Sequence, residues 1–326
     1  MRQGIHLAIL FLLLAANMVS AQPTQSTLSG GYIPRPPDEP FRKELNRTRR
    51  VKPWPYIREA DVLWRKRVWE EIDVKQKMNY PLFYPLQEKK GRKSLWQVIN
   101  AGLEDPMSGM IAYKAYATVA DGGYEDDEFT NPVPITDLGS VLGPKFVIDS
   151  VCKSMRIPQN LDTDGDCVLD SVDACKTEPG KADFSDPKKN GCPTKFEPTD
   201  IVSYQLKEDW IFDKQRSQRF VRIIGIAPMY LDSTEKVPVR KPMFWLYYKQ
   251  CRGVFAEAEC FNMMNDAFKG TFEDLFETRR FTGFVIKEEN IYDRKIQDYA
   301  QGIDALLEGE RIKKEIFEYE HDLWNY

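Results

Sequence analysis

Residues 61–77 read Asp-Val-Leu-Trp-Arg-Lys-Arg-Val-Trp-Glu-Glu-Ile-Asp-Val-Lys-Gln-Lys and open the first folded part of the chain. Trp64, Val68 and Ile72 recur within this stretch at intervals of four residues. An apolar stripe with that spacing is typical of an amphipathic helix. The pattern therefore predicts a helix over the whole stretch, and Pro81 ends it because the proline ring cannot continue a helix.

Three further segments predict helices. Ser94 is the expected N-cap of a helix that runs to Leu103, and Thr271-Phe-Glu-Asp274 resembles a capping box that opens a helix ending near Arg280. Residues 287–326 are predicted to be mostly helical. The apolar face of this last segment is expected to consist of Ile291, Ile296, Tyr299, Ile303, Leu306 and Leu307.

Strand patterns concentrate in the second half of the chain. Residues 202–206 alternate between apolar and polar side chains, residues 220–224 alternate in part, and residues 243–248 form another short apolar segment. Prolines between the last two segments indicate an antiparallel pair joined by a long loop. Residues 111–119 alternate weakly and are a further candidate strand. The predicted fold class is α+β, with mixed helices and antiparallel strands, interrupted by a small disulfide- and calcium-stapled insert.

The N-terminus predicts export. Met1-Arg2 gives a charged start, residues 5–16 form an apolar run broken only by His6, and Val19-Ser20-Ala21 follows as a small-residue cleavage site. These features are typical of a secretory signal peptide over residues 1–21. The apolar run is too short to span a bilayer, and an uncleaved N-terminal anchor is the alternative interpretation.

Composition divides the remaining chain into four parts. Residues 22–55 are rich in proline and basic residues and are expected to be an extended linker or a solvated leader. Hydrophobic residues are 42% and aromatic residues 12% of the 326-residue chain, so residues 56–150 and 197–326 can together build a sizeable core. Residues 151–196 are poor in aromatic residues, and so small an insert needs metal or disulfides for its stability.

The insert contains a loop with the ligand spacing of a calcium site. Residues 162–173 place aspartates at relative positions 1, 3, 5, 9 and 12. In EF-type loops, oxygen donors at that spacing converge on one cation, although Cys167 stands here where glycine usually makes the turn. An acidic solvated loop is the alternative. The predicted Ca²⁺ ligands are the side chains of Asp162, Asp164, Asp166, Asp170 and Asp173 and the backbone carbonyl of Val168.

The six cysteines all lie beyond residue 150. An even number of cysteines in an exported protein favours disulfides. Zinc binding by the first four is the alternative, but their spacing lacks a C-x2-C knuckle and an oxidising compartment disfavours free thiolates. The expected pairs are Cys175–Cys192, Cys251–Cys260 and, by elimination, Cys152–Cys167.

Charge and residue content argue against several functional classes. The formal charge is −4, with 46 basic and 50 acidic residues intermixed, so nucleic acid is not an expected partner. No segment after the signal peptide is long and apolar enough to predict a membrane span. Beyond that peptide, His321 is the single histidine of the sequence, and no glycine-rich phosphate loop is present. We therefore predict a protein that is not an enzyme, with a hydrolase based on paired carboxylates as a less favoured alternative.

The aspartate-rich insert resembles a thrombospondin type 3 calcium repeat. The pattern Asp-x-Asp-x-Asp-x-x-x-Asp-x-x-Asp-x-Cys, closed by Asn190-Gly-Cys-Pro193, is similar to the repeat that precedes OmpA-family peptidoglycan-binding domains. That resemblance covers about 40 residues, and it implies a calcium-binding spacer without catalysis.

The flanking parts resemble the GldN/PorN family of the type IX secretion and gliding apparatus. The resemblance rests on strings that recur in order through most of the chain. They are Asp61 to Asp73, Met78-Asn-Tyr-Pro-Leu-Phe-Tyr-Pro85, Lys207-Glu-Asp-Trp-Ile-Phe-Asp-Lys214, Ile224-Gly-Ile-Ala-Pro228, Phe244-Trp-Leu-Tyr-Tyr248 and Glu320-His-Asp-Leu-Trp324. The acidic cysteine-rich insert departs from the usual pattern of that family.

The family resemblance implies a function. It implies a non-enzymatic structural component of a periplasmic ring, associated with the inner face of the outer membrane and without a membrane span. The implied partners are a GldK/PorK-like lipoprotein, the GldM/PorM-like motor protein and further copies of the chain in the ring. The insert alone suggests the alternative of a calcium-dependent adhesin or a cell-wall-binding module.

Five aromatic and arginine residues are candidate partner anchors, because these residue types dominate interface hot spots. Helical spacing favours the alternative that the two tryptophans lie in the core. The candidates are Trp64, Arg67, Trp69, Tyr80 and Tyr84.

Overall fold

The computed structural model describes residues 49–116, 125–134, 138, 142, 168–169, 171–173, 196–232, 239–263, 265 and 269–322. The chain separates into two compact units, Met1–Glu44 and Leu45–Tyr326. All described residues belong to the second unit, so the predicted signal peptide and most of the predicted linker lie outside them.

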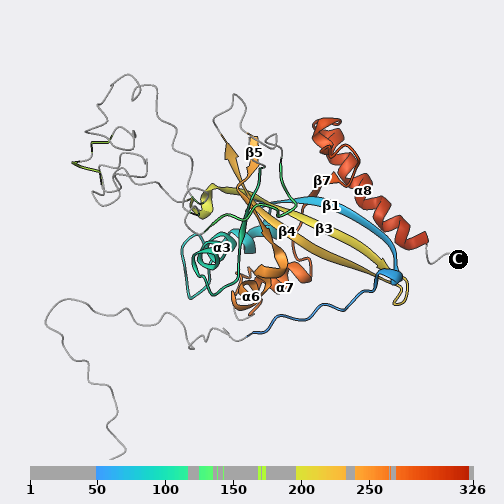
Figure 1. Ribbon diagram of the computed structural model, residues 1–326, viewed down its shortest axis with the longest axis horizontal. Helices are drawn as coiled ribbons and strands as arrows, with labels where there is room; N and C mark the ends of the chain where they lie inside the picture. The colour runs from blue at the N-terminus through green and yellow to red at the C-terminus, as the bar shows by residue number, and fades with distance from the viewer. Residues whose placement is uncertain are drawn as a thin grey trace, which may run out of the picture. The chain divides into compact units, whose positions relative to one another are not determined.

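A seven-stranded sheet forms the centre of this unit (Figure 1). The strand order is β2-β6-β4-β3-β1-β7, and β5 also pairs with β4. Every pairing is antiparallel, which confirms the predicted strand arrangement and the α+β class. The strands are β1 (Val62–Asp73), β2 (Ala112–Lys114), β3 (Ile201–Asp213), β4 (Gln218–Asp232), β5 (Val239–Pro242), β6 (Phe244–Tyr247) and β7 (Phe284–Glu288).

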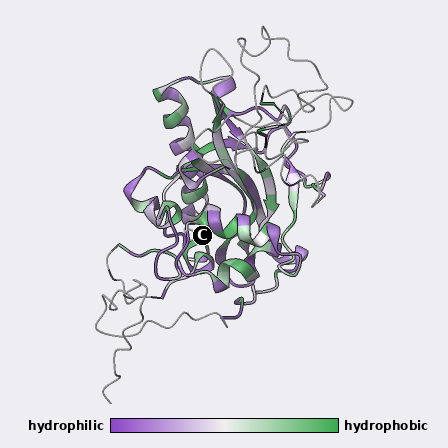
Figure 2. Cartoon of the chain, turned by 90° about the vertical axis from the view of Figure 1, so that its left-hand side faces the viewer, coloured by the Kyte–Doolittle hydropathy of each residue, from purple (hydrophilic) through white to green (hydrophobic). Residues whose placement is uncertain are grey.

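Helices accompany the sheet, and polar and apolar colours alternate along them as expected of amphipathic helices (Figure 2). The longer ones are α3 (Leu95–Glu104), α6 (Tyr248–Glu257) and α8 (Ile303–Asp322), and α2 (Tyr80–Phe83) and α7 (Phe272–Glu277) are short. The single-turn 3₁₀ segments are η1 (Glu59–Asp61), η2 (Lys77–Asn79), η5 (Pro198–Asp200) and η6 (Ile296–Asp298).

The helix predicted over residues 61–77 is wrong, because residues 62–73 form the strand β1. Residues four apart lie on one face of a helix, but they also lie on one face of a strand, where side chains alternate with period two. Trp64, Val68 and Ile72 are therefore on one side of β1, with Trp69 on the other. Both faces are covered in the second half of the strand, so apolar residues appear on both.

The predicted helix caps are confirmed. The Ser94 hydroxyl accepts a hydrogen bond from the backbone N–H of Gln97, whose side chain accepts one from the Ser94 N–H. Thr271 and Asp274 form the same reciprocal pair at the start of α7. These bonds satisfy N–H groups that have no partner inside the helix, so each helix begins at the residue that follows its cap.

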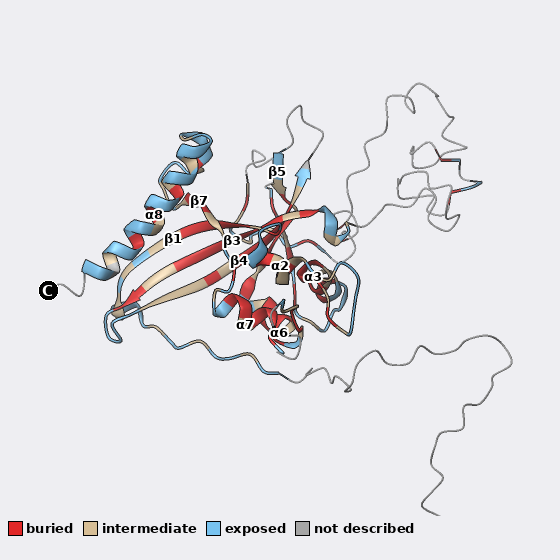
Figure 3. Ribbon diagram, turned by 180° about the vertical axis from the view of Figure 1, so that it is seen from behind, coloured by how far each residue is buried: buried red, intermediate tan, exposed pale blue. Residues whose placement is uncertain are grey.

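The principal core lies between the sheet and the group α3, α6 and α7 (Figure 3). Trp96 of α3, Tyr204 of β3 and Phe244 of β6 are at most 1% exposed there. Strands β4 and β6 pair at Ile226 and Leu246, which confirms the predicted antiparallel contact between these segments. Tyr248, predicted as part of the last strand, instead begins α6 and is fully buried.

The apolar face predicted for the C-terminal segment is wrong in all but one residue. Ile296 is 2% exposed, whereas Ile291, Tyr299, Ile303, Leu306 and Leu307 are 98%, 52%, 75%, 54% and 61% exposed. The residues of α8 that pack inward are Ile312 and Ile316, which contact Val68 and Val285 in a second, smaller cluster. Residues 291–299 precede α8 and contain only the single turn η6, so one helical stripe cannot include them.

Candidate interaction surfaces

An ion network connects β1, β3 and the segment after α7. The Arg279 guanidinium donates to Glu208 and to Glu70, each at 2.6 Å, and the two carboxylate side chains are 0% and 5% exposed. Lys313 of α8 also pairs with Glu70 at 3.0 Å. Burial raises the pKa of Glu208, while Arg279 opposes that rise. Because each buried charge has a partner, the network fixes strands and helix in one arrangement.

Trp69 is an internal residue on the other side of β1. It is 5% exposed, and its indole N–H donates to the Asp127 carboxylate at 2.6 Å. The ammonium groups of Lys287 and Lys207 lie 4.4 and 5.5 Å from its ring centroid. Burial lowers the pKa of Lys207, and the Asp127 charge opposes that effect. This candidate anchor therefore holds the 125–134 segment on the sheet, as the core alternative proposed.

Arg67 is paired within the sheet. Its guanidinium donates to both oxygens of Asp209, at 2.6 and 3.0 Å, and the two residues are direct cross-strand neighbours. The hydrogen bond that Arg67 donates to Asp209 raises the pKa of Arg67 further than burial lowers it. Arg65 shares the same carboxylate at 2.9 Å. A bidentate pair of this kind holds the arginine in one orientation, with 24% of its side chain exposed.

The remaining candidate anchors lie apart from these residues. Trp64 is half-buried and stacks on Tyr319 of α8, with ring centroids 4.8 Å apart. Tyr80 and Tyr84 meet edge to face at 5.5 Å around the short helix α2, and Tyr84 is 39% exposed. The structure thus brings Trp64 to α8, Arg67 and Trp69 to the other side of β1, and the two tyrosines together. Tyr84 is the most exposed of the five.

Residues 49–58 form an extended strap that sequence reasoning did not place (Figure 1). Residues 49–55 of the predicted linker belong to it, and side chains of the folded body hold their backbone. Arg252 donates to the carbonyl of Lys52 at 2.6 Å, and Arg222 donates to that of Pro55 at 3.3 Å. Arg216 donates to the carbonyl of Tyr56 at 3.1 Å.

Trp54 is the aromatic anchor of the strap. Its indole N–H donates to Glu277 at 2.9 Å, and its ring lies 4.3 Å from the Arg252 guanidinium and 4.9 Å from that of Arg222. Burial lowers the pKa of Arg222. The sequence feature that could have indicated this contact is a lone tryptophan between two prolines. Neither a helical nor a strand periodicity explains an apolar residue at that position.

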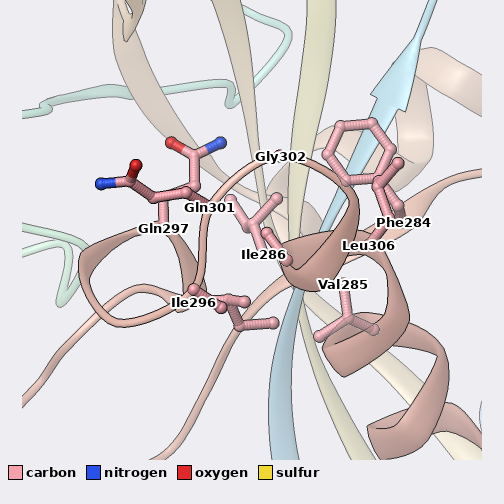
Figure 4. A pocket seen from close by; sticks show the side chains of 10 residues that line it. Phe284, Val285, Ile286, Ile296, Gln297, Gln301, Gly302 and Leu306 are labelled. Atoms are coloured by element: carbon pink, nitrogen blue, oxygen red, sulfur yellow. The ribbon is translucent and has the colours of Figure 1, made fainter.

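The C-terminal segment carries an apolar cavity of about 460 Å³ (Figure 4). Residues 284–286 of β7 form one wall, and η6 and the first turn of α8 form the others. Figure 4 shows Gln297 and Gln301 on one side of the cavity and Phe284 and Leu306 on the other. Leu306, which lines the cavity, is 54% exposed, and its neighbour Leu307 is 61% exposed.

The expected disulfide between Cys251 and Cys260 is wrong, because both residues are free thiols. Cys251 lies in α6 and its thiol donates to the carbonyl of Tyr247, while Cys260 lies after the helix and pairs by its backbone with Gly270. The helical rise, about 1.5 Å per residue, carries the chain away from Cys251 before Cys260 is reached. Burial raises the pKa of Cys260 to about 11 and raises that of Cys251 further.

The predicted calcium loop is described only in part. Val168 and Asp173 are 5% and 6% exposed, and the backbone N–H of Asp173 donates to the carbonyl of Leu169 at 3.0 Å. The other predicted ligands, and the remaining cysteines, lie outside the described residues. These are Asp162, Asp164, Asp166, Asp170, Cys152, Cys167, Cys175 and Cys192.

Within the described ranges, no three or more His, Cys, Asp or Glu side chains are grouped so that they could hold a metal ion. In the same ranges, no helix has both the length and the hydropathy of a membrane span.

The chain is an α+β protein whose sheet strands are joined by ion pairs between their side chains. It also exposes apolar side chains on the helix α8, and exposed apolar surface is a feature of proteins that bind other proteins. Residues 57–325 match the family described as gliding motility associated protein GldN, and the chain belongs to that family. The protein is therefore a component of the gliding motility and type IX secretion machinery, and its family is a structural one of the periplasm. No curated protein matches the chain.

Proposed function

We propose that the protein is a non-enzymatic structural component of a periplasmic ring beneath the outer membrane. In this role it assembles with a GldK/PorK-like lipoprotein, contacts further copies of itself and couples the ring to a GldM/PorM-like motor protein. Residues 1–21 direct its export and are then removed. The observation that carries the proposal is the GldN family match, which spans residues 57–325 and so includes the whole described sheet.

The internal bonding of the sheet supports a mechanical role. Arg279 joins β1 to β3, Lys313 joins α8 to β1, and Arg67 joins β1 to β3 a second time. A ring that transmits force needs subunits whose elements keep their positions under load. Buried cross-strand ion pairs, of which the Arg67 pair is bidentate, give that rigidity, because breaking one of them would leave a buried charge without compensation.

We retain Tyr84 and Tyr80 as anchors for the lipoprotein partner. Tyr84 combines 39% exposure with a fixed orientation against the Tyr80 ring. Trp64, Arg67 and Trp69 instead make their ring and charge contacts within the fold, where they orient β1. An exposed tyrosine with a packed base offers apolar area and a hydroxyl at a small entropic cost.

We propose that the insert binds one Ca²⁺ through the ligands predicted for residues 162–173. Its four cysteines, residues 152, 167, 175 and 192, form two disulfides that staple the surrounding segment. The support is the five-aspartate spacing and the buried positions of Val168 and Asp173. A stapled unit of this kind acts as a spacer between the two family-like parts.

Co-purification tests the proposed partner. Residues 22–326 with an affinity tag are co-expressed in the periplasm with the GldK/PorK-like lipoprotein lacking its lipid anchor. We expect the lipoprotein to elute with the tagged chain, and Tyr84→Ala to reduce its recovery at least fivefold. Tyr56→Ala, the same substitution at a residue that is 79% exposed on the strap, is the matched control and leaves recovery unchanged.

The aspartate spacing of the insert favours a second candidate function, a calcium-dependent adhesin or cell-wall-binding module. Purified peptidoglycan sacculi distinguish the two. Calcium-dependent sedimentation of the protein with sacculi, together with no recovery of the lipoprotein, supports this second candidate and contradicts the ring component.

A further inference from the structure

Helix α8 has two apolar faces, of which the fold uses one. Gly309, Ile312 and Ile316 face the sheet and are buried. At 100° per residue, Leu307 lies opposite this buried face and Phe317 lies on its flank, roughly 100° away, and each is 61% exposed. Figure 3 shows α8 mostly in the colour of exposed residues.

The exposed face follows a coiled-coil repeat. Ile303, Leu307, Glu310, Lys314 and Phe317 succeed one another at intervals of 4, 3, 4 and 3 residues. This is the spacing of the a and d positions of a heptad, which form the seam between two paired helices. We call these five residues the α8 seam. Three of its positions are apolar, and the two charged ones, Glu310 and Lys314, lie at its centre.

Four of the five seam residues, all but Ile303, are arranged symmetrically about residue 312. Leu307 and Phe317 each lie five residues from that point, and Glu310 and Lys314 each lie two residues from it. Two copies of α8 that run antiparallel therefore place Leu307 against Phe317 twice and Glu310 against Lys314 twice. In antiparallel pairs an a position faces a d position, and these matches satisfy that rule.

We propose that two copies of this chain dimerise through the α8 seam as an antiparallel helix pair. A parallel pair in the same register would place Glu310 against Glu310 and Lys314 against Lys314, which like-charge repulsion disfavours. The antiparallel arrangement joins opposite charges and apolar side chains. The charge pattern of α8 therefore favours a second copy of the same helix as its partner.

The existing ion pair of Lys314 does not prevent this contact. Its ammonium group lies 3.3 Å from Glu318, one turn further on, and the two side chains are 72% and 58% exposed. An exposed pair at this spacing contributes little stability, so Lys314 can exchange Glu318 for Glu310 of the partner copy at little cost.

The contact is small, so the dimer is reversible. A seam about 30 Å long and about 10 Å wide buries about 600 Å² in total, below the roughly 1,200 Å² of standard interfaces. Because the interface is isologous, it closes at two copies, and ring growth needs a different surface. The dimer is thus separable from the proposed ring, and failure of either leaves the other intact.

Sedimentation velocity over a concentration series tests the dimer. The purified parent is expected to pass from monomer to dimer in the micromolar range. Glu310→Lys and Lys314→Glu each place like charges together at two symmetry-related points, and each is expected to raise the dimer Kd at least tenfold. The double variant Glu310→Lys/Lys314→Glu restores opposite charges and is expected to return the Kd to within threefold of the parent.

Two controls keep the result interpretable. Lys249→Glu makes the same charge change at an exposed residue of α6, and it leaves the Kd unchanged. All variants keep the parent's thermal transition, because the altered side chains are exposed. A parent that stays monomeric through the series overturns the proposal. A dimer Kd that is unchanged in both single variants also overturns it. A double variant whose dimer Kd is as high as that of either single variant does so too.

Discussion

The guanidinium Nη1 of Arg279 donates to the Oε1 of Glu208 at 2.6 Å, although the two residues are 71 positions apart in the sequence. Glu208 is in the middle of β3 and fully buried, so its charge depends on that one arginine and on the nearby indole N–H of Trp210, 3.2 Å away. Arg279 in turn stacks 5.1 Å from the ring of Trp210. The contact connects the long strands to the segment that leads into β7.

Removal of this arginine should strongly destabilise the protein. Arg279→Ala leaves Glu208 buried without its cationic partner, and we expect the free energy of unfolding to fall by about 3–5 kcal/mol. Urea unfolding followed by tryptophan fluorescence measures it. Arg65→Ala is the control, since that arginine is 42% exposed and its pair with Asp209 should contribute less than about 1 kcal/mol. Equal losses in the two variants would contradict this account.

The strap should detach when its aromatic anchor is removed. Trp54→Ala removes the hydrogen bond to Glu277 and the contacts with Arg222 and Arg252, with an expected loss of about 1–2 kcal/mol. We also expect trypsin to cleave at Arg50 or Arg58 at least fivefold faster. Tyr56→Ala changes a neighbouring ring that is 79% exposed and should leave the cleavage rate as it is. Unchanged cleavage in the Trp54 variant would show that the strap is held by other contacts.

Asp213 makes a defined contribution to the pH dependence of stability. Burial by itself would raise the pKa of its carboxyl, but hydrogen bonds from the Arg216 side chain and from the backbone N–H groups of Arg216 and Gln215 outweigh burial and lower that pKa. A depressed acid pKa stabilises the fold above the unfolded-state value, and this stability is lost as the pH falls through the folded-state value.

Asp213→Asn should therefore be less stable than the parent at pH 7, and the difference should shrink towards pH 2. Urea midpoints across that range provide the test. Asp293→Asn makes the same substitution at an exposed carboxylate beside Lys287 and serves as the comparison. A difference in urea midpoint between Asp213→Asn and the parent that stays constant with pH would rule out this contribution of Asp213.

The thiol content separates the two groups of cysteines. Cys251 and Cys260 are buried free thiols, and burial keeps both protonated at pH 8. We expect Ellman's reagent to detect essentially no thiol in the native protein, because both free thiols are buried. In denaturant it should detect two thiols per chain, since the other four cysteines are proposed to form disulfides. Six thiols after denaturation would contradict the stapled insert, and none would contradict the free pair.

Calcium should protect the insert. Asp164→Ala removes one of the proposed ligands, and we expect at least a tenfold rise in the calcium Kd by calorimetry and faster proteolysis within residues 151–196. Asp200→Ala, at an exposed aspartate just after the insert, is the matched control. Equal calcium affinity in Asp164→Ala and the parent would refute the proposed coordination.

Local features of the fold could be predicted from the sequence. Ser94 and Thr271 begin helices as expected because a cap needs only a hydroxyl and a partner three residues later. Alternation around Tyr204 likewise identified β3. Such signals involve neighbouring residues, so tertiary contacts do not alter them.

Features that depend on distant contacts were not predictable. The spacing of Trp64, Val68 and Ile72 fits both a helix and a strand, and only pairing with β3 and β7 selects the strand. Leu307 and Phe317 are apolar without being buried, because the sheet covers the opposite side of α8. Of the candidate anchors, Trp69 is in the interior, which its sequence neighbours alone could not decide.

Electron microscopy of the protein mixed with its lipoprotein partner tests the central claim most directly. Equimolar residues 22–326 and the soluble GldK/PorK-like lipoprotein are combined at micromolar concentration and imaged after size fractionation. We predict closed rings that contain both chains. Separate particles of monomer or dimer size at every mixing ratio would contradict the assignment of this protein as a structural ring subunit.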